Sequence, residues 1–510
     1  MPNHMNPPNR ECTGRIAGAP VATPAKILLI LAAAALGPGC AGPVRFKPPA
    51  EVRRTDGETV LAFDMDGRGG PDYWQYQDAS GRKRAIAFSG PQPGRPGDRI
   101  GLDDIPAGQV PHFLIALDGV PFDLVEQLYR EGHFRLFHPP GRVICCFPSM
   151  TDLALSQLFG GPAPVANEAL YFDRVANRMS RGNEVYLSGA NSPWVRRVQY
   201  RCSTWWDARA YLDPQSVFDH ELAGMSEVFR RTAAGQAFAY SVGTAGLGTR
   251  GGREAIRRYL LTIDRMCEQI VHERRGRVKL TLTADHGHNL TPCRLISIED
   301  LLTRGGYRVG KSLRGDRDVV VVAYGLITVA SLYTRDPDGV STCLLASDDV
   351  DLAFYPAGEG IVVRSRGGRA LVRKDHDGWI YQASRGDPLQ LTDVIDRLRA
   401  AGKVSPAGRI DDAALFCATV DHVYPDPLAR VWEAFHGIVQ QPPDLIISLR
   451  DGACHGSRFF HAMIGQVAST HGSLNRANST TFLLTMLGEV PPAARTRDVM
   501  AILERLRSGG

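Results

Sequence analysis

Several hallmarks of other protein classes are missing from this 510-residue sequence. It has no block of lysine and arginine, and its formal net charge is only +5, so nucleic-acid binding is not expected. Its ten cysteines fit neither a zinc-finger spacing nor a short-spacing disulfide framework. No internal repeat is visible, and the apolar run at 27–36 is shorter than the roughly 20 residues that span a bilayer. A hydrophobic share of 44% is enough for a sizeable core.

The N-terminal 40 residues have the pattern of an export signal. Basic residues, the last of them Lys26, precede the short apolar run. The sequence Gly37-Pro38-Gly39-Cys40 follows and resembles a bacterial lipobox, although Leu36 lies one place too far upstream. We therefore expect residues 1–40 to be a lipoprotein-type signal segment, and Cys40 to carry a lipid that anchors the exported protein in the membrane of a bacterial cell envelope. Plain secretion is the alternative.

Changes in composition divide the remaining chain into domains. Residues 41–110 are expected to hold a proline- and charge-rich tether, up to about Thr55, and a small β-rich segment. Within it, the stretch from Asp64 to Asp72 is similar to a calcium loop, but Arg68 stands where an oxygen ligand is needed, so a polar turn is favoured. An α/β domain is expected at 111–303 and 415–510, interrupted at 304–414 by an inserted cap of short β-branched runs.

Apolar runs alternate with helical patterns in the α/β domain. The run Phe113–Leu117 is followed by an amphipathic helix, and the run Val278–Leu282 follows a long helical pattern at 252–271. Such alternation favours a parallel sheet with helices on both faces. The sequence therefore predicts an α/β fold, with a mainly parallel sheet sandwiched by helices and an inserted β-rich cap subdomain.

Asp118 follows the first of these runs directly, and Asp285 and His286 follow the second after Thr283 and Ala284. Ligands of open α/β sheets bind at the carboxyl ends of strands, where such side chains converge. An adjacent carboxylate and imidazole suit a divalent cation such as zinc or manganese. The simpler alternative is that Asp285 caps the next segment and that the histidines hydrogen-bond within a loop.

The turn Phe147-Pro148-Ser149-Met150-Thr151 lies between a predicted strand and a predicted helix. It places a hydroxyl at a helix N-terminus, where free N–H groups and the helix dipole favour an anion such as phosphate. A metal beside Thr151 would lower the pKa of its hydroxyl and make it a nucleophile. The alternative is helix capping, because Ser149 and Asp152 have the spacing of a capping box.

In this order, the motifs resemble the alkaline phosphatase superfamily, and within it the type I phosphodiesterase/nucleotide pyrophosphatase branch. The resemblance covers roughly 111–298 and 443–487. The matching segments are Asp118-Gly119, Phe147 to Thr151, Gly160-Gly161-Pro162, Tyr171-Phe172-Asp173, Asp285-His286-Gly287 and Thr470-His471-Gly472-Ser473.

This resemblance implies an alkaline-phosphatase-like fold and a hydrolase of phosphate esters or diesters, with Thr151 as the catalytic nucleophile. One divalent metal, with zinc favoured, would be surrounded by Asp118, Thr151, Asp285 and His286. His471 would belong to a second ion, so that the pair activates the nucleophile and stabilises charge on the phosphoryl oxygens. The expected partner is a small phosphate-containing substrate, and the sequence does not indicate an oligomeric state.

The sequence departs from the family at the second metal site. The family supplies two further ligands from the motif Asp-x-x-Gly-His-x-x-Gly, but this chain has Ala245 (or Thr244) in place of the aspartate and Thr249 in place of the histidine. Neither residue type is a good metal ligand, so the second site is expected to be lost or rebuilt. The candidate substitutes are His288, His455 and His461, with Arg250 as a positive charge in the metal's place.

Two functions from different classes therefore remain open. The first is a lipid-anchored metallohydrolase of phosphate esters or diesters with one firm metal. The second is a pseudo-hydrolase that keeps the fold and serves as a binding lipoprotein for a metal or an anionic ligand. A monoester phosphatase or sulfatase is a further alternative, because members of this superfamily differ mainly in their substrate pockets.

Overall fold

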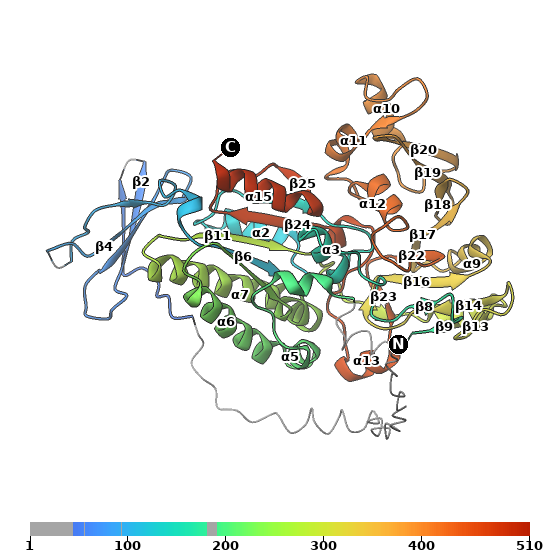
Figure 1. Cartoon of the computed structure of the whole chain (residues 1–510), viewed down its shortest axis with the longest axis horizontal. Helices are drawn as coiled ribbons and strands as arrows, with labels where there is room; N and C mark the ends of the chain where they lie inside the picture. Colours follow the sequence, from blue (N-terminus) through green and yellow to red (C-terminus); the bar gives the residue numbers. More distant parts are fainter. Residues whose placement is uncertain (1–43, 56, 93, 181–190, 510) are drawn as a thin grey trace, which may run out of the picture. The chain divides into compact units, whose positions relative to one another are not determined.

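A six-stranded sheet forms the centre of the α/β part of the chain (Figure 1). The computed structural model describes residues 44–55, 57–92, 94–180 and 191–509. The strands of this sheet are β6 (His112–Leu117), β7 (Gly141–Ile144), β10 (Gln236–Ser241), β11 (Lys279–Ala284), β24 (Thr480–Thr485) and β25 (Ala493–Arg495). Their order is β10-β6-β11-β24-β7-β25, and all neighbours are parallel except β24, which runs antiparallel to β11 and β7. The prediction of a mainly parallel sheet is confirmed.

Alternating side chains of β6 explain why helices cover both faces of this sheet. Phe113, Ile115 and Leu117 lie in one buried apolar cluster, and Leu114 and Ala116 lie in another. The first cluster is completed by helices α2 (Phe122–Arg130), α6 (Pro214–Arg231) and α7 (Gly243–Glu273), and the second by α3 (Thr151–Leu158) and α15 (Val499–Ser508). Because each buried large apolar side chain contributes about 1.5–3 kcal/mol, the two layers hold the strand ends firmly in place.

A nine-stranded sheet forms the β-rich part of the chain. In their order across the sheet, its strands are β13 (Arg308–Val309), β14 (Asp318–Val321), β16 (Val329–Thr334), β22 (Leu445–Leu449), β17 (Val350–Ala357), β18 (Gly360–Arg364), β19 (Arg369–Asp375), β20 (Gly378–Arg385) and β21 (Ile410–Asp411). From the sequence, β22 is expected in the α/β domain, because a fully apolar run suits a buried strand of either sheet. It instead pairs antiparallel with β16 and β17, so the β-rich part includes a strand from outside 304–414.

A separate five-stranded sheet precedes the α/β part. Its strands, in order, are β1 (Glu51–Thr55), β2 (Glu58–Phe63), β3 (Tyr73–Gln77), β4 (Lys83–Phe88) and β5 (Ile100–Gly101). Strand β1 lies in the segment expected to be a tether; all its residues are exposed, so no hydrophobic alternation marks it in the sequence. The stretch between β2 and β3 forms the favoured polar turn, in which the Asp64 carboxylate accepts bonds from the backbone N–H groups of Gly67 and Gly69.

Smaller elements complete the described part of the chain. Short strands are β8 (Phe172–Asp173), β9 (Arg178–Met179), β12 (Arg294–Leu295), β15 (Leu326–Ile327) and β23 (Ala453–Gly456). Other helices are η1 (Ala107–Gln109), η2 (Pro193–Arg197), α5 (Thr204–Arg209), α8 (Ile298–Arg304), α9 (Pro337–Leu344), α10 (Thr392–Ala400), α11 (Asp412–Thr419), α12 (Pro427–Glu433), α13 (Arg458–Ile464), α14 (Arg476–Ser479) and η3 (Thr496–Asp498). Among the described residues, no helix combines the length and apolarity needed to cross a membrane. The predicted signal segment and Cys40 lie outside the described residues.

Candidate metal centre

The register of two parallel strands places two carboxylates side by side. Strands β6 and β11 pair with Leu117 opposite Ala284. Asp118 and Asp285 are the next residues, and the backbone N–H of Asp285 donates to the carbonyl of Leu117 across 3.3 Å. Both aspartates therefore lie at the carboxyl edge of the sheet.

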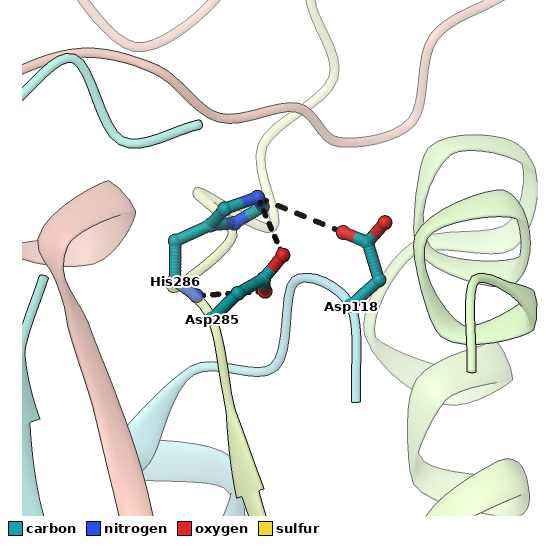
Figure 2. Close-up of side chains that lie close together, drawn as sticks. All are labelled: Asp118, Asp285 and His286. Atoms are coloured by element: carbon teal, nitrogen blue, oxygen red, sulfur yellow. Dashed lines mark hydrogen bonds and ion pairs between the residues drawn. The ribbon is translucent and has the colours of Figure 1, made fainter. Parts of the chain in front are cut away.

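Three buried side chains converge at this edge (Figure 2). Asp118, Asp285 and His286 each offer one ligand atom, and these atoms all lie within 4.8 Å of one another. His286 Nε2 is 3.6 Å from Asp118 Oδ1 and 3.4 Å from Asp285 Oδ2. Ligand atoms about 2.0–2.1 Å from a tetrahedral zinc ion are separated by about 3.3–3.4 Å, so the observed separations suit one shared cation.

The hydrogen bonds of these three groups leave their converging atoms unsatisfied. Asp285 Oδ1 accepts bonds from the backbone N–H groups of Gly119 (2.9 Å) and His286 (2.7 Å), whereas Asp285 Oδ2 and Asp118 Oδ1 are buried without a partner. His286 Nδ1 is 2.9 Å from the carbonyl of Gly287. Since a carbonyl only accepts, Nδ1 carries the proton and Nε2 presents a lone pair to both aspartates. Three facing lone-pair atoms are costly to bury alone, so the donor set fits a cation.

Burial also decides the charge states of this cluster in the absence of an ion. It raises the pKa of Asp285 to about 7, against the backbone hydrogen bonds from Gly119 and His286 that lower it. Burial, followed by the charge of Asp285, raises the pKa of Asp118 as well. Burial lowers the pKa of His286 to about 4, so its ring stays neutral and able to ligate. A cation replaces the protons that the carboxylates would otherwise hold.

Thr151 adjoins the same cluster. Its Oγ1 lies 3.4 Å from His286 Nε2, within hydrogen-bond distance of the nitrogen that faces both aspartates. Thr151 is the first residue of α3, and the turn before it passes through Phe147, so the hydroxyl stands at the N-terminus of a helix. The structure thus brings together four of the residues expected from the sequence to surround one ion.

The capping alternative for this turn is wrong. The N-cap of α3 is Met150, and no side chain caps the helix. Ser149 Oγ instead donates toward the backbone carbonyls of Cys146 (3.2 Å) and Ser473 (3.3 Å). The Asp152 carboxylate accepts bonds from side chains that include the Trp194 indole N–H at 2.8 Å. The first N–H groups of α3 are therefore left to other acceptors, as anion binding requires.

His471, expected at a second ion, packs directly against the cluster. Its ring stacks on His286 with centroids 3.9 Å apart and planes 18° from parallel. His288 lies beside it, with ring centroids 5.5 Å apart, and its Nε2 is buried without a partner. The approach of His288 depends on Gly119, where a Cβ atom would lie 2.6 Å from the His288 ring. His471 is nevertheless not part of the group whose ligand atoms all lie within 4.8 Å of one another.

The positions that differ from the family remain without ligands. Thr244, Ala245 and Thr249 are buried in the first turns of α7, and none carries a carboxylate or an imidazole. Of the candidate substitutes, His455 is engaged elsewhere, since its Nε2 donates to the carbonyl of Val322 at 2.8 Å. His288 is the one that the described contacts place beside the centre; His461 lies in α13, and Arg250 is exposed.

Tyr240 belongs to the centre but was not expected from the sequence. Its hydroxyl donates to Asp118 Oδ2 across 2.5 Å, which leaves Oδ1 as the free oxygen. Tyr240 lies in β10, one strand away from Asp118. In the sequence it is one more aromatic residue of an apolar strand, and no local pattern distinguishes it from the core.

Comparison with known proteins gives likeness of fold at low similarity. No family model and no curated protein sequence matches the chain. Among solved structures, phosphonoacetate hydrolase from Sinorhizobium meliloti 1021 in complex with phosphonoformate matches with a TM-score of 0.47 and 12% identity, over 83% of this chain and 100% of that one. Murine ectonucleotide pyrophosphatase/phosphodiesterase 5 matches with a TM-score of 0.41 and 13% identity, over 78% and 94%. Matches at this level assign no family.

Proposed function

We propose that this protein is a metal-dependent hydrolase of phosphate esters or diesters, with Thr151 as its nucleophile. One observation carries the proposal: Asp118 Oδ1, Asp285 Oδ2 and His286 Nε2 face one another as buried lone-pair atoms beside a threonine hydroxyl. If these three groups had only a structural role, hydrogen-bond donors would have to lie between their lone-pair atoms. A cation bound between them would instead satisfy all three.

The proposed ion is a single zinc held by Asp118, Asp285 and His286. Carboxylate oxygens and an imidazole nitrogen are zinc ligands, and three protein ligands leave the open position of a catalytic site. When bound, the ion would lower the pKa of a neighbouring hydroxyl and offset negative charge on a phosphoryl group. Two ions are less well supported, because Ala245 and Thr249 add no ligand beside His471.

The protein's own groups then position and transfer the phosphoryl group. Thr151 Oγ1 bonds to phosphorus while the bond to the ester oxygen breaks, and the leaving oxygen takes up a proton from solvent to give the alcohol. The Thr151 proton is released to solvent, which this half-buried residue contacts. Water then cleaves the phosphothreonine and restores the hydroxyl. The free N–H groups at the start of α3 hold the phosphoryl oxygens through both steps.

A pseudo-hydrolase is the second candidate, and the side chains of α7 favour it. Thr244, Ala245 and Thr249 offer no second set of ligands, so a chain of this kind can hold a metal or an anion without turnover. Metal content and turnover measured on the same sample distinguish the two functions. The substrates should include bis(4-nitrophenyl) phosphate, 4-nitrophenyl phosphate and 4-nitrophenyl sulfate.

For a hydrolase, we expect about one ion per chain and release of 4-nitrophenol from a phosphate ester. Asp118→Asn should lose the ion and lower turnover by about 100-fold or more. Asp213→Asn is the matched control, because Asp213 caps α6 and is not one of the grouped candidate ligands. A full complement of metal with no turnover of either phosphate ester would instead establish the pseudo-hydrolase.

We further propose that the protein is exported and held at a bacterial membrane by a lipid on Cys40. The support is the sequence pattern at 26–40, a basic flank, a short apolar run and a lipobox-like end. In this proposal the hydrolase acts in the cell envelope, on small phosphate-containing substrates outside the cytoplasm.

A further inference from the structure

A buried arginine lies beneath the turn that presents the nucleophile. Arg430, in α12, has only 3% of its surface exposed. Its NH1 donates to the carbonyls of Pro425 and Leu474, each at 3.0 Å. Its NH2 donates to the carbonyl of Cys146 (3.2 Å) and to the hydroxyls of Ser149 (3.3 Å) and Ser479 (2.5 Å). Each of these acceptors is an uncharged oxygen, and together they belong to three separate segments.

Two of the three segments adjoin residues at or beside the metal centre. The first, from Cys146 to Ser149, ends two residues before Thr151. The second, from Leu474 to Ser479, begins three residues after His471. The backbone N–H of Ser149 donates to the carbonyl of Gly472 at 3.0 Å, which joins the first segment to the stretch that leads into the second.

The same layer of hydrogen bonds reaches the aspartate–histidine turn. The backbone N–H of Gly287 donates to the carbonyl of Asn478 at 3.0 Å. Asn478 precedes Ser479, whose hydroxyl Arg430 binds and which itself donates to the carbonyl of Leu474. A single guanidinium therefore lies under both Thr151 and His286, without contacting either side chain.

Burying a charged guanidinium costs desolvation free energy, so its presence here indicates that its hydrogen-bonding geometry is needed. Asp426, the buried carboxylate beside α12, is bound by Arg495 rather than by Arg430. The NH1 and NH2 groups of Arg430 thus bond to backbone carbonyls and hydroxyls, which fixes loop conformation, whereas Nε has no partner among the described residues. Asp426 and Glu433 lie close enough to feel the charge of Arg430, but neither carboxylate accepts a hydrogen bond from it. Only arginine offers five donors in a rigid fork; lysine has one ammonium group with three.

We propose that Arg430 is a positioning residue: it locks the Cys146–Ser149 turn to the Leu474–Ser479 segment so that Thr151 Oγ1 faces His286 Nε2. The inference rests on the proposed function for its kinetic consequence, but the placement of Thr151 is a structural consequence in its own right. A displacement of about 1 Å at a nucleophile costs about 100-fold in rate.

The test compares Arg430→Lys with Arg82→Lys. Arg82 is equally buried, but it binds Asp103 beside the N-terminal sheet, so its replacement controls for the general loss of a buried arginine. Arg430→Lys should lower kcat for the best phosphate ester by about 100-fold, while KM and the zinc Kd stay within about threefold, because no metal ligand contacts Arg430. Arg82→Lys should keep kcat. If Arg430→Lys does not fold, Ser479→Ala removes one Arg430 bond and should lower kcat by about tenfold.

Wild-type kcat in a folded Arg430→Lys protein would overturn the inference. So would a parallel loss of kcat and zinc affinity, which indicates damage to the whole centre. A crystal structure of the variant separates this inference from the proposed function. The Thr151 Oγ1 to His286 Nε2 separation, 3.4 Å in the native chain, should increase by about 1 Å. If it does so in a chain that hydrolyses no phosphate ester, only the proposed function fails; an unchanged separation overturns the positioning role, whatever the turnover.

Discussion

His471 Nδ1 donates a hydrogen bond to the backbone carbonyl of Ser149 across 2.8 Å, although 322 positions separate the two residues in the sequence. The bond joins the late histidine to the turn that presents Thr151. It also fixes the tautomer of His471, since the carbonyl only accepts and Nε2 is left with a lone pair. The position of His471 and the position of the turn before Thr151 are therefore linked. A substitution at His471 should also affect Thr151.

Replacing the nucleophile tests the chemical proposal. Thr151→Ala should abolish turnover, whereas zinc affinity should stay largely intact because Asp118, Asp285 and His286 remain. Thr151→Ser should keep part of the activity, since the hydroxyl is retained. The free energy of unfolding should change by less than about 1 kcal/mol in both variants, because Thr151 caps no helix. Full activity of Thr151→Ala, measured by release of 4-nitrophenol, would rule out the nucleophile.

Metal removal should destabilise the protein more at high pH than at low pH. The pKa of Asp285 is about 7 in the fold and about 3.9 when unfolded. Without metal, its extra proton stabilises the fold at low pH, and this contribution is lost as pH rises through about 7. A bound cation replaces that proton, so the gain in Tm on adding zinc should grow by several degrees between about pH 5 and pH 8.

Differential scanning calorimetry of zinc-loaded and EDTA-treated protein measures this gain. Glu168 and Glu221, whose pKa values burial also raises to about 7, titrate in both forms and cancel in the difference. Asp285→Asn should reduce the pH dependence of the gain, and Asp118, whose pKa burial also raises, accounts for what is left. A gain that is the same at both pH values in the native chain would contradict the assignment of Asp285 as a ligand.

Restoring the missing ligands tests the second site. Ala245→Asp combined with Thr249→His should raise the metal content from about one to about two ions per chain, and phosphodiesterase turnover by about tenfold or more. The matched control is Ala245→Asn with Thr249→Gln, which adds similar volume with weaker ligands. Elemental analysis measures the metal content of both variants, and the phosphodiesterase assay measures their turnover. If the double variant folds and still holds one ion, the start of α7 is not a second metal site that lacks only these two ligands.

The lipid anchor has its own test. The mature protein should begin at Cys40 and carry acyl chains there, and mass spectrometry of the native N-terminal peptide measures both. Cys40→Ser should move the protein from the membrane fraction to the soluble fraction. An unmodified N-terminus downstream of Cys40 in a soluble native protein would exclude the anchor.

Local pattern was sufficient to predict the centre of the fold. The apolar runs that end at Leu117 and Leu282 are long enough to read as buried strands, and the carboxylates after them follow from the shared edge of parallel strands. The helix predicted to follow the Phe147–Thr151 turn is likewise present, at Thr151–Leu158.

The rest depends on contacts that no local pattern records. Strand β1 has only exposed side chains and exists because its backbone pairs with β2. Strand β22 is apolar throughout, which suits either sheet, and only tertiary pairing decides between them. Tyr240 bonds to Asp118, which lies 122 positions away in the sequence. Apart from Pro425, the partners of Arg430 lie at least 44 positions away. No local spacing in the sequence therefore marks either residue.

The central claim is that one divalent cation lies between Asp118, Asp285 and His286 beside Thr151. Anomalous diffraction at the zinc edge, from crystals grown with zinc, tests it most directly. We predict one strong peak about 2.0–2.2 Å from Asp118 Oδ1, Asp285 Oδ2 and His286 Nε2, and its loss in Asp118→Asn crystals. No peak at this position in zinc-saturated crystals, with the three side chains arranged as described, would contradict the account.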